Sequence, residues 1–381
     1  MTATCLPPTV AEIDLGAFAH NLQTTRARLA PGCGLMAVLK ANAYGHGAVP
    51  LARVAAQHGV TSLGVARCQE GIALRQQGIQ LPIVVLGPTW PEEVEALLTS
   101  QLTPVAGSLA DLQSFQATAS RRDVVWAVHL KIDTGMGRFG VTPTDVPGVL
   151  ACLSACTHLR LEGLMTHLAC ADTSDVASVQ QQLARFQAVV RVCAQHALRP
   201  RYIHAANSAG VYRYPTSHGT LVRAGIALYG TPTFAAPAVE QLRPVLHWKT
   251  RLVRVQAVPA GSGVGYGHTF VTRRASVIGT LPLGYGDGLS RKLSNCGEVL
   301  LHGQRVPLVG QICMDMCMVD LTAVPCAQVG DEVVLIGAQG NARMTAEELA
   351  MHCDSIPYEV LCAISQRVPR RYLPVEPPIC P

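Results

Sequence analysis

Between about residues 35 and 230, short apolar runs of the β-strand type alternate with amphipathic runs of the helix type, and this alternation constrains the fold most strongly. Eight short runs typical of β-strands occupy residues 35–41, 62–66, 82–87, 102–106, 124–133, 159–167, 201–208 and 220–230. Amphipathic runs typical of helices lie between several of them, at residues 49–59, 68–78, 91–101, 108–120 and 176–198. Strands that alternate with helices form a parallel sheet, and eight of them favour an α/β fold closed as a (β/α)8 barrel of the TIM type.

The pattern changes after LRPVLHWKT, which ends at residue 250. From there, β-type runs separated by Gly and Pro turns occupy residues 250–261, 275–284, 298–310, 317–321 and 331–337. One helix is predicted at TAEELAMHC, where Thr345 and Glu348 have the spacing of a capping box. We therefore expect a barrel domain over residues 1–243 and a mostly β domain over residues 244–381. About the first ten residues could pack on the second domain instead.

The composition excludes several classes of protein. A hydrophobic content of 49% supports a large core, and a net charge of +5 forms no cluster of basic and aromatic residues, so no nucleic-acid partner is expected. No apolar run is long enough to cross a membrane, and the N-terminus lacks the features of a secretory signal. The 14 cysteines include no CxxC pair, which favours free thiols, no metal site and a cytoplasmic location.

Lysine is scarce, and one lysine has an unusual position. The chain has four lysines and 26 arginines, and Lys40 ends the first strand-like run, in MAVLKANAYGHG. Active sites of such barrels lie at the carboxyl ends of the strands. An amine desolvated there would have a lowered pKa and could form a Schiff base with a carbonyl compound. The alternative is an ordinary lysine that extends to the surface.

The residues around Lys40 resemble the cofactor-lysine motif of the alanine racemases. These are pyridoxal-phosphate enzymes of fold type III, which consist of a barrel and a β domain. Further matches follow in the expected order, so that the resemblance spans residues 10–372: HLKIDTGMGRFG (129–140), GLMTHLA (163–169), HAANSAG (204–210), VRAGIALYG (222–230), GVGYGHTF (263–270), LGYGDG (283–288), ICMDM (312–316) and YEVLCAIS (358–365).

The resemblance implies that Lys40 holds pyridoxal 5′-phosphate (PLP) as an aldimine. It also implies that the cofactor phosphate is bound by a set of hydroxyl and backbone N–H donors: Tyr44, Ser208, Gly225, Ile226 and Tyr358. Arg223 would face the pyridine nitrogen and disfavour its protonation, and His204 would orient Arg223. Taken alone, Ser208 could be a turn serine, Tyr358 a core tyrosine, and Arg223 the partner of an acid.

Racemisation requires proton exchange on both faces of Cα, which favours two bases. By resemblance these are Lys40 and Tyr266, with His167, itself hydrogen-bonded to Arg223, beside the tyrosine. Tyr266 would come from the partner subunit, so a homodimer with shared active sites is expected. The remaining assignments are Arg138 and Met314 for the substrate carboxylate, and Tyr285, Asp315, Asp172 and Arg291 for the entrance.

Lys131 is the second unusual lysine, because Arg138 follows it by seven residues. In many family members the matching lysine is carbamylated, which turns a cation into an anion that can pair with the arginine. The alternative is an unmodified lysine paired with Asp133.

The predicted function is interconversion of L- and D-alanine, which would supply D-alanine for bacterial peptidoglycan. A broad-specificity racemase and a non-catalytic PLP-binding protein are the alternatives, but the latter would not need the β domain or Tyr266. A decarboxylase of the same fold type would favour an acid where this chain has Arg223. The run GSGVGYG (261–267) is not a dinucleotide-binding loop, because position 266 is tyrosine and no helix pattern follows.

Overall fold

The computed structural model describes residues 7–375, which pack into two units. The barrel unit comprises Phe18–Ala43 and Ala48–Arg243. The β unit comprises the described residues up to Ala17, the segment Tyr44–Gly47 and the described residues from Pro244 onward. Two stretches that precede residue 244 therefore pack with the β unit, and one of them begins four residues after Lys40.

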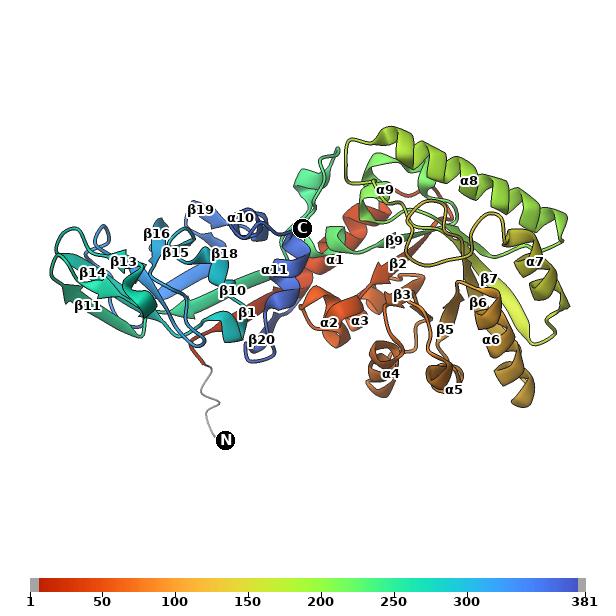
Figure 1. Ribbon diagram of the computed structural model, residues 1–381, viewed down its shortest axis with the longest axis horizontal. Coiled ribbons are helices and arrows are strands. Elements are labelled where there is room, and N and C mark those ends of the chain that lie inside the picture. The colour runs from red at the N-terminus through yellow and green to blue at the C-terminus, as the bar shows by residue number, and fades with distance from the viewer. Residues whose placement is uncertain (1–6, 376–381) are drawn as a thin grey trace, which may run out of the picture. The chain divides into compact units, whose positions relative to one another are not determined.

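Eight parallel strands form the sheet of the barrel unit (Figure 1). In spatial order they are β8 (Tyr202–His204), β7 (Leu159–Met165), β6 (Trp126–Lys131), β5 (Thr103–Ala106), β4 (Ile83–Val85), β3 (Ser62–Val65), β2 (Gly34–Val38) and β9 (Leu221–Ala224). The two outer strands are joined by backbone hydrogen bonds from Thr220 N to Ile203 O at 2.9 Å and from Arg223 N to Ala206 O at 3.0 Å. The sheet nearly closes, which confirms the predicted α/β barrel.

The interior of this barrel is a packed core. Its centre consists of buried apolar side chains from five strands: Met36, Val84, Val105, Met165 and Leu221. Burial of branched and unbranched apolar side chains from alternating strands fills a barrel of this size. The functional groups are therefore confined to the strand ends and the loops that follow them.

The helices of the barrel unit follow the strands in sequence. They are α3 (Ala48–Gln57), α4 (Cys68–Gln76), α5 (Val94–Thr99), α6 (Leu109–Arg121), α7 (Val146–Ala155), α8 (Val176–Gln195) and α9 (Ser208–Arg213). In α6, the Ser108 hydroxyl accepts a hydrogen bond from Asp111 N at 3.1 Å and caps the helix. Leu112, Phe115 and Ala119 form its buried face, as the helical spacing predicts. A helix before the first barrel strand, α1 (Leu15–Arg26), was not predicted.

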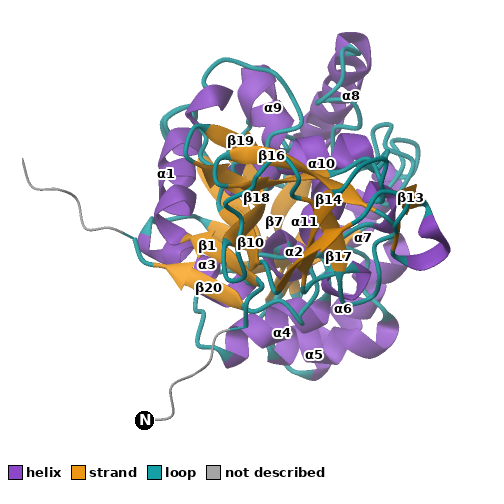
Figure 2. Ribbon diagram, turned by 90° about the vertical axis from the view of Figure 1, so that its left-hand side faces the viewer, coloured by secondary structure: helices purple, strands orange, loops and turns teal. Residues whose placement is uncertain are grey.

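The β unit contains a mixed sheet, parts of which are drawn in orange in Figure 2. Its main path is β11 (Arg254–Val258), β14 (Ser276–Leu281), β17 (Cys317–Asp320), β16 (Gln304–Val309), β15 (Glu298–Leu301), β18 (Glu332–Gln339), β10 (Leu246–Arg251), β1 (Val10–Asp14) and β20 (Arg370–Leu373). Strand β19 (Ala342–Met344) pairs with β18. The mostly β second domain is thus confirmed.

Two short helices belong to the β unit. Helix α10 (Ala346–His352) has the predicted capping box, because Thr345 Oγ1 accepts from Glu348 N at 3.2 Å and Glu348 accepts from Thr345 N at 3.1 Å. Helix α11 (Pro357–Ala363) was not predicted, and it begins with proline at its first position. It carries Tyr358, one of the expected cofactor residues.

Candidate active site

The predicted chemical groups of the barrel unit lie where the barrel strands end. Lys131 is the last residue of β6 and His204 is the last residue of β8. His167 follows β7 by two residues, and Arg223 lies in β9. Lys40 follows β2, but it is exposed, whereas residues 35–39 are buried. In the single chain the side chain of Lys40 therefore lies beyond the buried part of the strand, and the desolvation of its amine stays a prediction.

Arg223 is buried, and its hydrogen bonds are all made to neutral acceptors. Its guanidinium donates to the backbone oxygens of His204 at 2.9 Å, Thr166 at 2.8 Å and Ala205 at 3.0 Å. Nη2 also donates to His167 Nδ1 at 3.3 Å. No acid pairs with Arg223 among residues 7–375, so the alternative of an ordinary ion pair is wrong. Burial lowers the pKa of Arg223 to about 10, which leaves it protonated at neutral pH.

His204 connects Arg223 to a histidine that sequence analysis missed. Arg223 Nη1 lies 3.0 Å from His204 Nδ1, and His204 Nε2 lies 3.0 Å from His129 Nδ1. Because arginine only donates, His204 must accept at Nδ1, carry its proton at Nε2 and donate to His129. Burial, and then the charge of Arg223, lower the pKa of His129 to about 3 and that of His204 well below its usual value. Both rings are neutral, and the hydrogen bonds fix their tautomers.

His167 is surrounded by positive charge. Its pKa lies well below the usual value, because of burial first and then because of four cations: Arg223, Arg138, Lys131 and Lys40. His167 is thus a neutral imidazole within a cluster of cationic side chains. We call Lys40, Lys131, Arg138 and Arg223 the cationic cluster. Such a cluster at the mouth of a barrel favours anionic ligands.

Lys131 is buried at the end of β6. Its Nζ lies 4.8 Å from the centre of the Phe139 ring. Burial and the charges of Arg138 and Arg223 lower the pKa of Lys131 to about 8, although Asp133 acts in the opposite direction. A substantial fraction of this amine is therefore neutral near physiological pH.

Asp133 organises the turn that carries Arg138. Its carboxylate accepts backbone hydrogen bonds from Gly135 at 3.0 Å, Met136 at 2.8 Å, Gly137 at 3.1 Å and Arg138 at 3.0 Å. Although burial raises the pKa of Asp133, these hydrogen bonds lower it below its usual value. The acid therefore holds the glycine-rich turn in place, and the turn positions Arg138 close to His167.

Ser208 and the segment after β9 form a group of small donors. The Ser208 hydroxyl accepts from Gly225 N at 2.8 Å and from Ala227 N at 3.3 Å, and Ile226 lies between these two residues. Asn207 caps α9, because its side chain accepts from Gly210 N at 3.0 Å. Several N–H groups and a hydroxyl thus converge on one small region, as they do where proteins bind phosphate.

The residues after Lys40 have an uncommon backbone. Four consecutive residues, Ala41 to Tyr44, have φ between 52° and 55°, which is the left-handed region. This conformation costs roughly 1–2 kcal/mol per residue for residues other than glycine. Hydrogen bonds from Ala41 N to Glu70 at 2.6 Å and from Ala48 N to Asn42 Oδ1 at 2.8 Å stabilise the turn. Backbone strain of this kind is concentrated at functional sites.

Tyr44 and Tyr358 lie together in the β unit. Their ring centres are 5.9 Å apart. His46 is buried, and its Nδ1 donates to the Tyr44 carbonyl at 2.9 Å. Gly45 has φ +83° and passes so close to α11 that a Cβ there would lie 2.4 Å from Leu361 O. The segment therefore requires glycine at this position, and the packing holds the two tyrosines side by side.

The remaining predicted residues of the β unit are exposed. The exposed fractions are 72% for Tyr266, 52% for Met314 and 46% for Tyr285, which are high for large apolar side chains. Tyr266 lies between β12 (Gly263–Val264) and β13 (Phe270–Val271), on a short 3₁₀ turn after Gly265, whose φ is +70°. This surface is accessible to another molecule.

Asp315 is held by an arginine that sequence analysis did not identify. Arg367 Nη2 donates to Asp315 at 2.6 Å, and Arg367 Nε lies 3.3 Å from Asp287.

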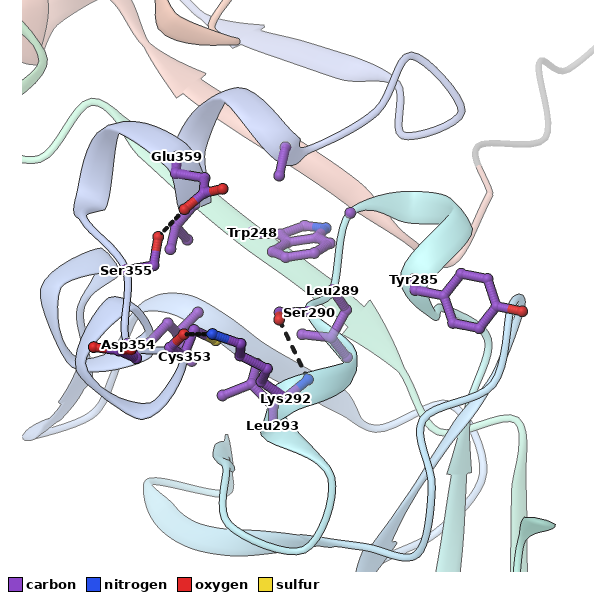
Figure 3. A pocket seen from close by; sticks show the side chains of 14 residues that line it. Trp248, Tyr285, Leu289, Ser290, Lys292, Leu293, Cys353, Asp354, Ser355 and Glu359 are labelled. Atoms are coloured by element: carbon purple, nitrogen blue, oxygen red, sulfur yellow. Dashed lines mark hydrogen bonds between the residues drawn. The ribbon is translucent and has the colours of Figure 1, made fainter.

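Tyr285 borders a cavity of about 330 Å³, which is also lined by Trp248, Lys292 and Glu359 (Figure 3). Among the described contacts, none joins the side chains of Asp172 or Arg291 to the other predicted residues.

Comparison with known proteins identifies the family. Residues 13–232 match the alanine racemase N-terminal domain, and residues 245–372 match the alanine racemase C-terminal domain. The chain belongs to the alanine racemase family. It is accordingly an isomerase, an amino-acid racemase. The run of matching segments noted in the sequence thus reflects true family membership.

Individual alanine racemases are similar over nearly their whole length. The alanine racemase of Symbiobacterium thermophilum is 46% identical, over 96% of this chain and 97% of that protein. That of Halothermothrix orenii is 42% identical, over 96% and 97%. The solved structure of the Streptomyces coelicolor A3(2) alanine racemase has a TM-score of 0.90 at 37% identity and covers 96% of this chain and 98% of that one. The Bacillus anthracis alanine racemase with bound L-Ala-P has a TM-score of 0.90 at 33% identity, over 98% and 96%.

Two further properties of this racemase concern the described residues only. None of its helices is both long enough and apolar enough to cross a membrane. In the same residues, no group of three or more His, Cys, Asp or Glu side chains could hold a metal ion.

Proposed function

We propose that the enzyme interconverts L- and D-alanine with pyridoxal 5′-phosphate bound covalently through Lys40. The observation that carries the proposal is the buried, protonated Arg223, which hydrogen-bonds to carbonyl oxygens and neutral histidines, within a cationic cluster that contains Lys40. The cofactor requires an amine that can bind its aldehyde, and the cofactor and an amino-acid substrate both carry anionic groups that cations can bind. A racemase also requires an arginine that is not paired with an acid.

The donor groups fit the cofactor. Ser208 and the N–H groups of Gly225 and Ile226 are assigned to the phosphate, and the hydroxyls of Tyr44 and Tyr358 are assigned to it as further donors. The support for this assignment is the close approach of Ser208 to Gly225 and the pairing of the two tyrosine rings at 5.9 Å. When bound, the cofactor withdraws electrons from the Cα–H bond of the attached amino acid.

Arg223 limits the withdrawal of electrons by the cofactor. It keeps its proton at neutral pH, so it disfavours protonation of a ring nitrogen placed beside it. His204 and His129 keep the guanidinium fixed without adding charge, because both rings are neutral. Weaker withdrawal favours return of the proton to Cα over reactions that consume the cofactor.

Lys40 and Tyr266 are the proposed bases, one for each face of Cα. In each direction, one base removes the proton from its face of Cα and the other base delivers a proton to the opposite face; in the reverse direction the two bases exchange these tasks. Tyr266 acts in the active site of the partner subunit of a homodimer, and its 72% exposure in the single chain supports this role. His167, a neutral imidazole bonded to Arg223, is the neighbour assigned to Tyr266.

Arg138 and the backbone N–H of Met314 are assigned to the substrate carboxylate. We assign carbamylation to Lys131, because its amine is partly neutral and only a neutral amine attacks carbon dioxide. The N–C bond forms, one proton leaves the nitrogen, and the resulting anion can pair with Arg138. The lowered pKa of Lys131 and the use of Asp133 by four backbone N–H groups favour this over a simple Lys131–Asp133 pair.

Tyr285, Asp315, Asp172 and Arg291 complete the proposal as residues of the entrance. The proposed role is supply of D-alanine for peptidoglycan in the cytoplasm. The test is a chiral assay of the purified enzyme with a panel of L-amino acids, together with borohydride reduction and peptide mapping. D-Alanine as the main product and a cofactor label on Lys40 are expected. Equal rates on larger amino acids would favour a broad-specificity racemase, and no label on Lys40 would overturn the cofactor assignment.

A further inference from the structure

Three side chains of the β unit form a chain of contacts in which a thiol, an imidazole and a carboxylate follow one another. Cys326 Sγ lies 3.4 Å from His302 Nδ1. His302 Nε2 lies 2.9 Å from Asp331 Oδ2. None of these residues has a role in the proposed racemisation. A nucleophile, a base and an acid that orients the base are the parts of an activated cysteine site.

The fold fixes the backbone that carries the imidazole. His302 and Gly303 are the two-residue turn between β15 and β16, in which Leu301 pairs with Gln304. Both turn residues have positive φ, 51° and 75°, as a tight hairpin of this type requires. Gly303 N donates to Gln339 Oε1 at 2.9 Å, which anchors the tip of the hairpin to β18.

The acid is anchored as well. Asp331 directly precedes β18, and its backbone N–H donates to the Gln328 carbonyl at 3.2 Å. Asp331 Oδ2 accepts from Gln328 N at 2.9 Å as well as facing His302. Its side chain is only 15% exposed, compared with 35% for His302. The carboxylate is therefore fixed on the inner side of the imidazole.

These contacts determine the tautomer of His302. An ionised carboxylate only accepts hydrogen bonds, so the proton of a neutral His302 lies on Nε2, toward Asp331. Nδ1 then has a free lone pair directed at Cys326. The imidazole is thus placed to take the thiol proton, and the neighbouring carboxylate stabilises the imidazolium that results.

Cys326 is exposed, so a dissolved reagent can reach it. Cys296, also in the β unit, is the matched comparison. It is exposed too, but its thiol donates to the Lys292 carbonyl at 3.1 Å. A carbonyl oxygen cannot remove a thiol proton, whereas an imidazole can. The two cysteines thus differ in the base beside them.

The geometry points to Cys326, His302 and Asp331 as a second reactive site, in which Cys326 exchanges with low-molecular-weight disulfides. In the step, the Cys326 proton passes to His302 Nδ1 and the thiolate attacks one sulfur of the disulfide. A new S–S bond forms to Cys326 and the original S–S bond breaks. The leaving thiolate takes the proton from His302 and becomes a free thiol. Cys326 is thus oxidised to a mixed disulfide with one half of the small disulfide, and the sulfur of the other half is reduced.

The surrounding backbone favours disulfide exchange over acyl transfer. Acyl transfer requires N–H donors for an oxyanion. The two N–H groups that follow Cys326 are engaged, because Ala327 N donates to Val324 O at 3.0 Å and Gln328 N donates to Asp331. Attack on a disulfide develops no oxyanion and needs neither donor.

The test measures the reactivity of individual cysteines in the native enzyme. Limiting iodoacetamide followed by peptide mass mapping gives the alkylation rates of Cys326 and Cys296 in the same sample. Glutathione disulfide is then supplied as the small disulfide, and the mixed disulfide is located by mapping before and after dithiothreitol. We expect Cys326 to react about tenfold faster than Cys296 and to take up one glutathionyl group that the reductant removes.

Two variants separate activation from simple exposure. His302→Asn suits the left-handed backbone of the turn and removes the base, and Asp331→Asn keeps an oxygen acceptor for Gln328 but removes the charge. Both variants should lower the reaction rate of Cys326 by up to about tenfold. The rate of Cys296 should not change, and this unchanged rate also shows that the variants are folded. Cys326→Ser should racemise alanine at the native rate. The proposal is overturned if Cys326 is no faster than Cys296 in the native enzyme, or if His302→Asn leaves its rate unchanged.

Discussion

Arg223 donates a hydrogen bond to Nδ1 of His204 at 3.0 Å, and the charge of the guanidinium is balanced by no acid among the described residues. The backbone oxygens of Thr166, His204 and Ala205 and the Nδ1 atom of His167 accept its other hydrogen bonds. The arginine is therefore held by dipoles rather than by an opposite charge. Its full positive charge remains available to whatever lies beside it.

The charge at position 223 should control the ratio of racemisation to side reaction. Arg223→Glu would place an acid beside the cofactor ring and permit protonation of the ring nitrogen, which strengthens electron withdrawal. We expect kcat for racemisation to fall by about 10²–10³ and pyruvate to appear as a product. Pyruvate is measured with lactate dehydrogenase. Arg223→Gln is the control, since it removes the same contacts without adding an acid; comparable pyruvate from both variants would contradict the argument.

His129 should contribute to stability through its neighbour. His129→Leu would leave the buried Nε2–H of His204 without its acceptor. An unsatisfied buried donor costs about 1–3 kcal/mol of the free energy of unfolding, which a urea titration measures. His129→Asn retains an acceptor near the same place and should lose less. If both variants lose equal stability, the hydrogen bond is not the cause.

Unmodified Lys131 should make stability depend on pH in a defined window. Its pKa is about 8 in the folded enzyme, compared with the ordinary value of 10.5. Below pH 8 the folded and unfolded forms are both protonated, so the burial penalty is present in full. Between about pH 8 and pH 10.5 the folded form has lost the proton that the unfolded form retains, so the free energy of unfolding rises with pH.

The matched variant for this prediction is Lys131→Met, which has no proton to lose. In buffers free of carbon dioxide, its stability relative to the native enzyme should be highest below pH 8, fall between about pH 8 and pH 10.5, and stay constant above that range. Denaturant unfolding at a series of pH values measures the difference. A difference that does not change with pH would show that the lysine does not titrate as described.

Carbamylation of Lys131 should depend on dissolved carbon dioxide. With ¹³C-bicarbonate, the native enzyme should show a carbamate carbon signal by NMR that is absent in Lys131→Met. Removing carbon dioxide should raise KM for alanine by about tenfold, because Arg138 would then face a partly cationic amine instead of an anion. Restoring bicarbonate should restore KM. An enzyme without the carbamate signal and with unchanged KM would retain an unmodified lysine.

The sequence predicts the barrel well because its strands are short apolar runs separated by turn residues. All eight predicted runs overlap a strand of the observed sheet. Helix α7 was missed because its sequence, VPGVLACLSA, is apolar on nearly all sides and has no helical periodicity. The pairing of β1 with β20 joins residues more than 350 positions apart, and local patterns contain no information about it.

The site was less predictable where it depends on contacts between distant residues. His129 lies two residues before Lys131 on the same strand, so both side chains point to one face, and that spacing was an available signal. Arg367 gave no signal, since its role depends on Asp315 and Asp287. The left-handed backbone of residues 41–44 contradicts local preference, because hydrogen bonds from other parts of the chain override it.

The two proposed bases should belong to different chains of the proposed dimer. Lys40→Ala and Tyr266→Ala should each be inactive as homodimers, because each lacks one base at both sites. If subunits are mixed and exchange, a heterodimer has one site with both mutations and one site with none. Activity should therefore reappear and approach about one quarter of the native value, since half the dimers are mixed and each has one intact site.

Exchange must be demonstrated independently, by native mass spectrometry of subunits with different tags. Tyr266→Phe provides a second measurement that needs no exchange: it should slow proton removal from L-alanine far more than from D-alanine, since each base serves one face of Cα. Deuterium washout from each enantiomer measures the two steps separately. Exchange without rescue would place Tyr266 in the active site of its own chain, and equal loss from both enantiomers would remove it from the two-base pair.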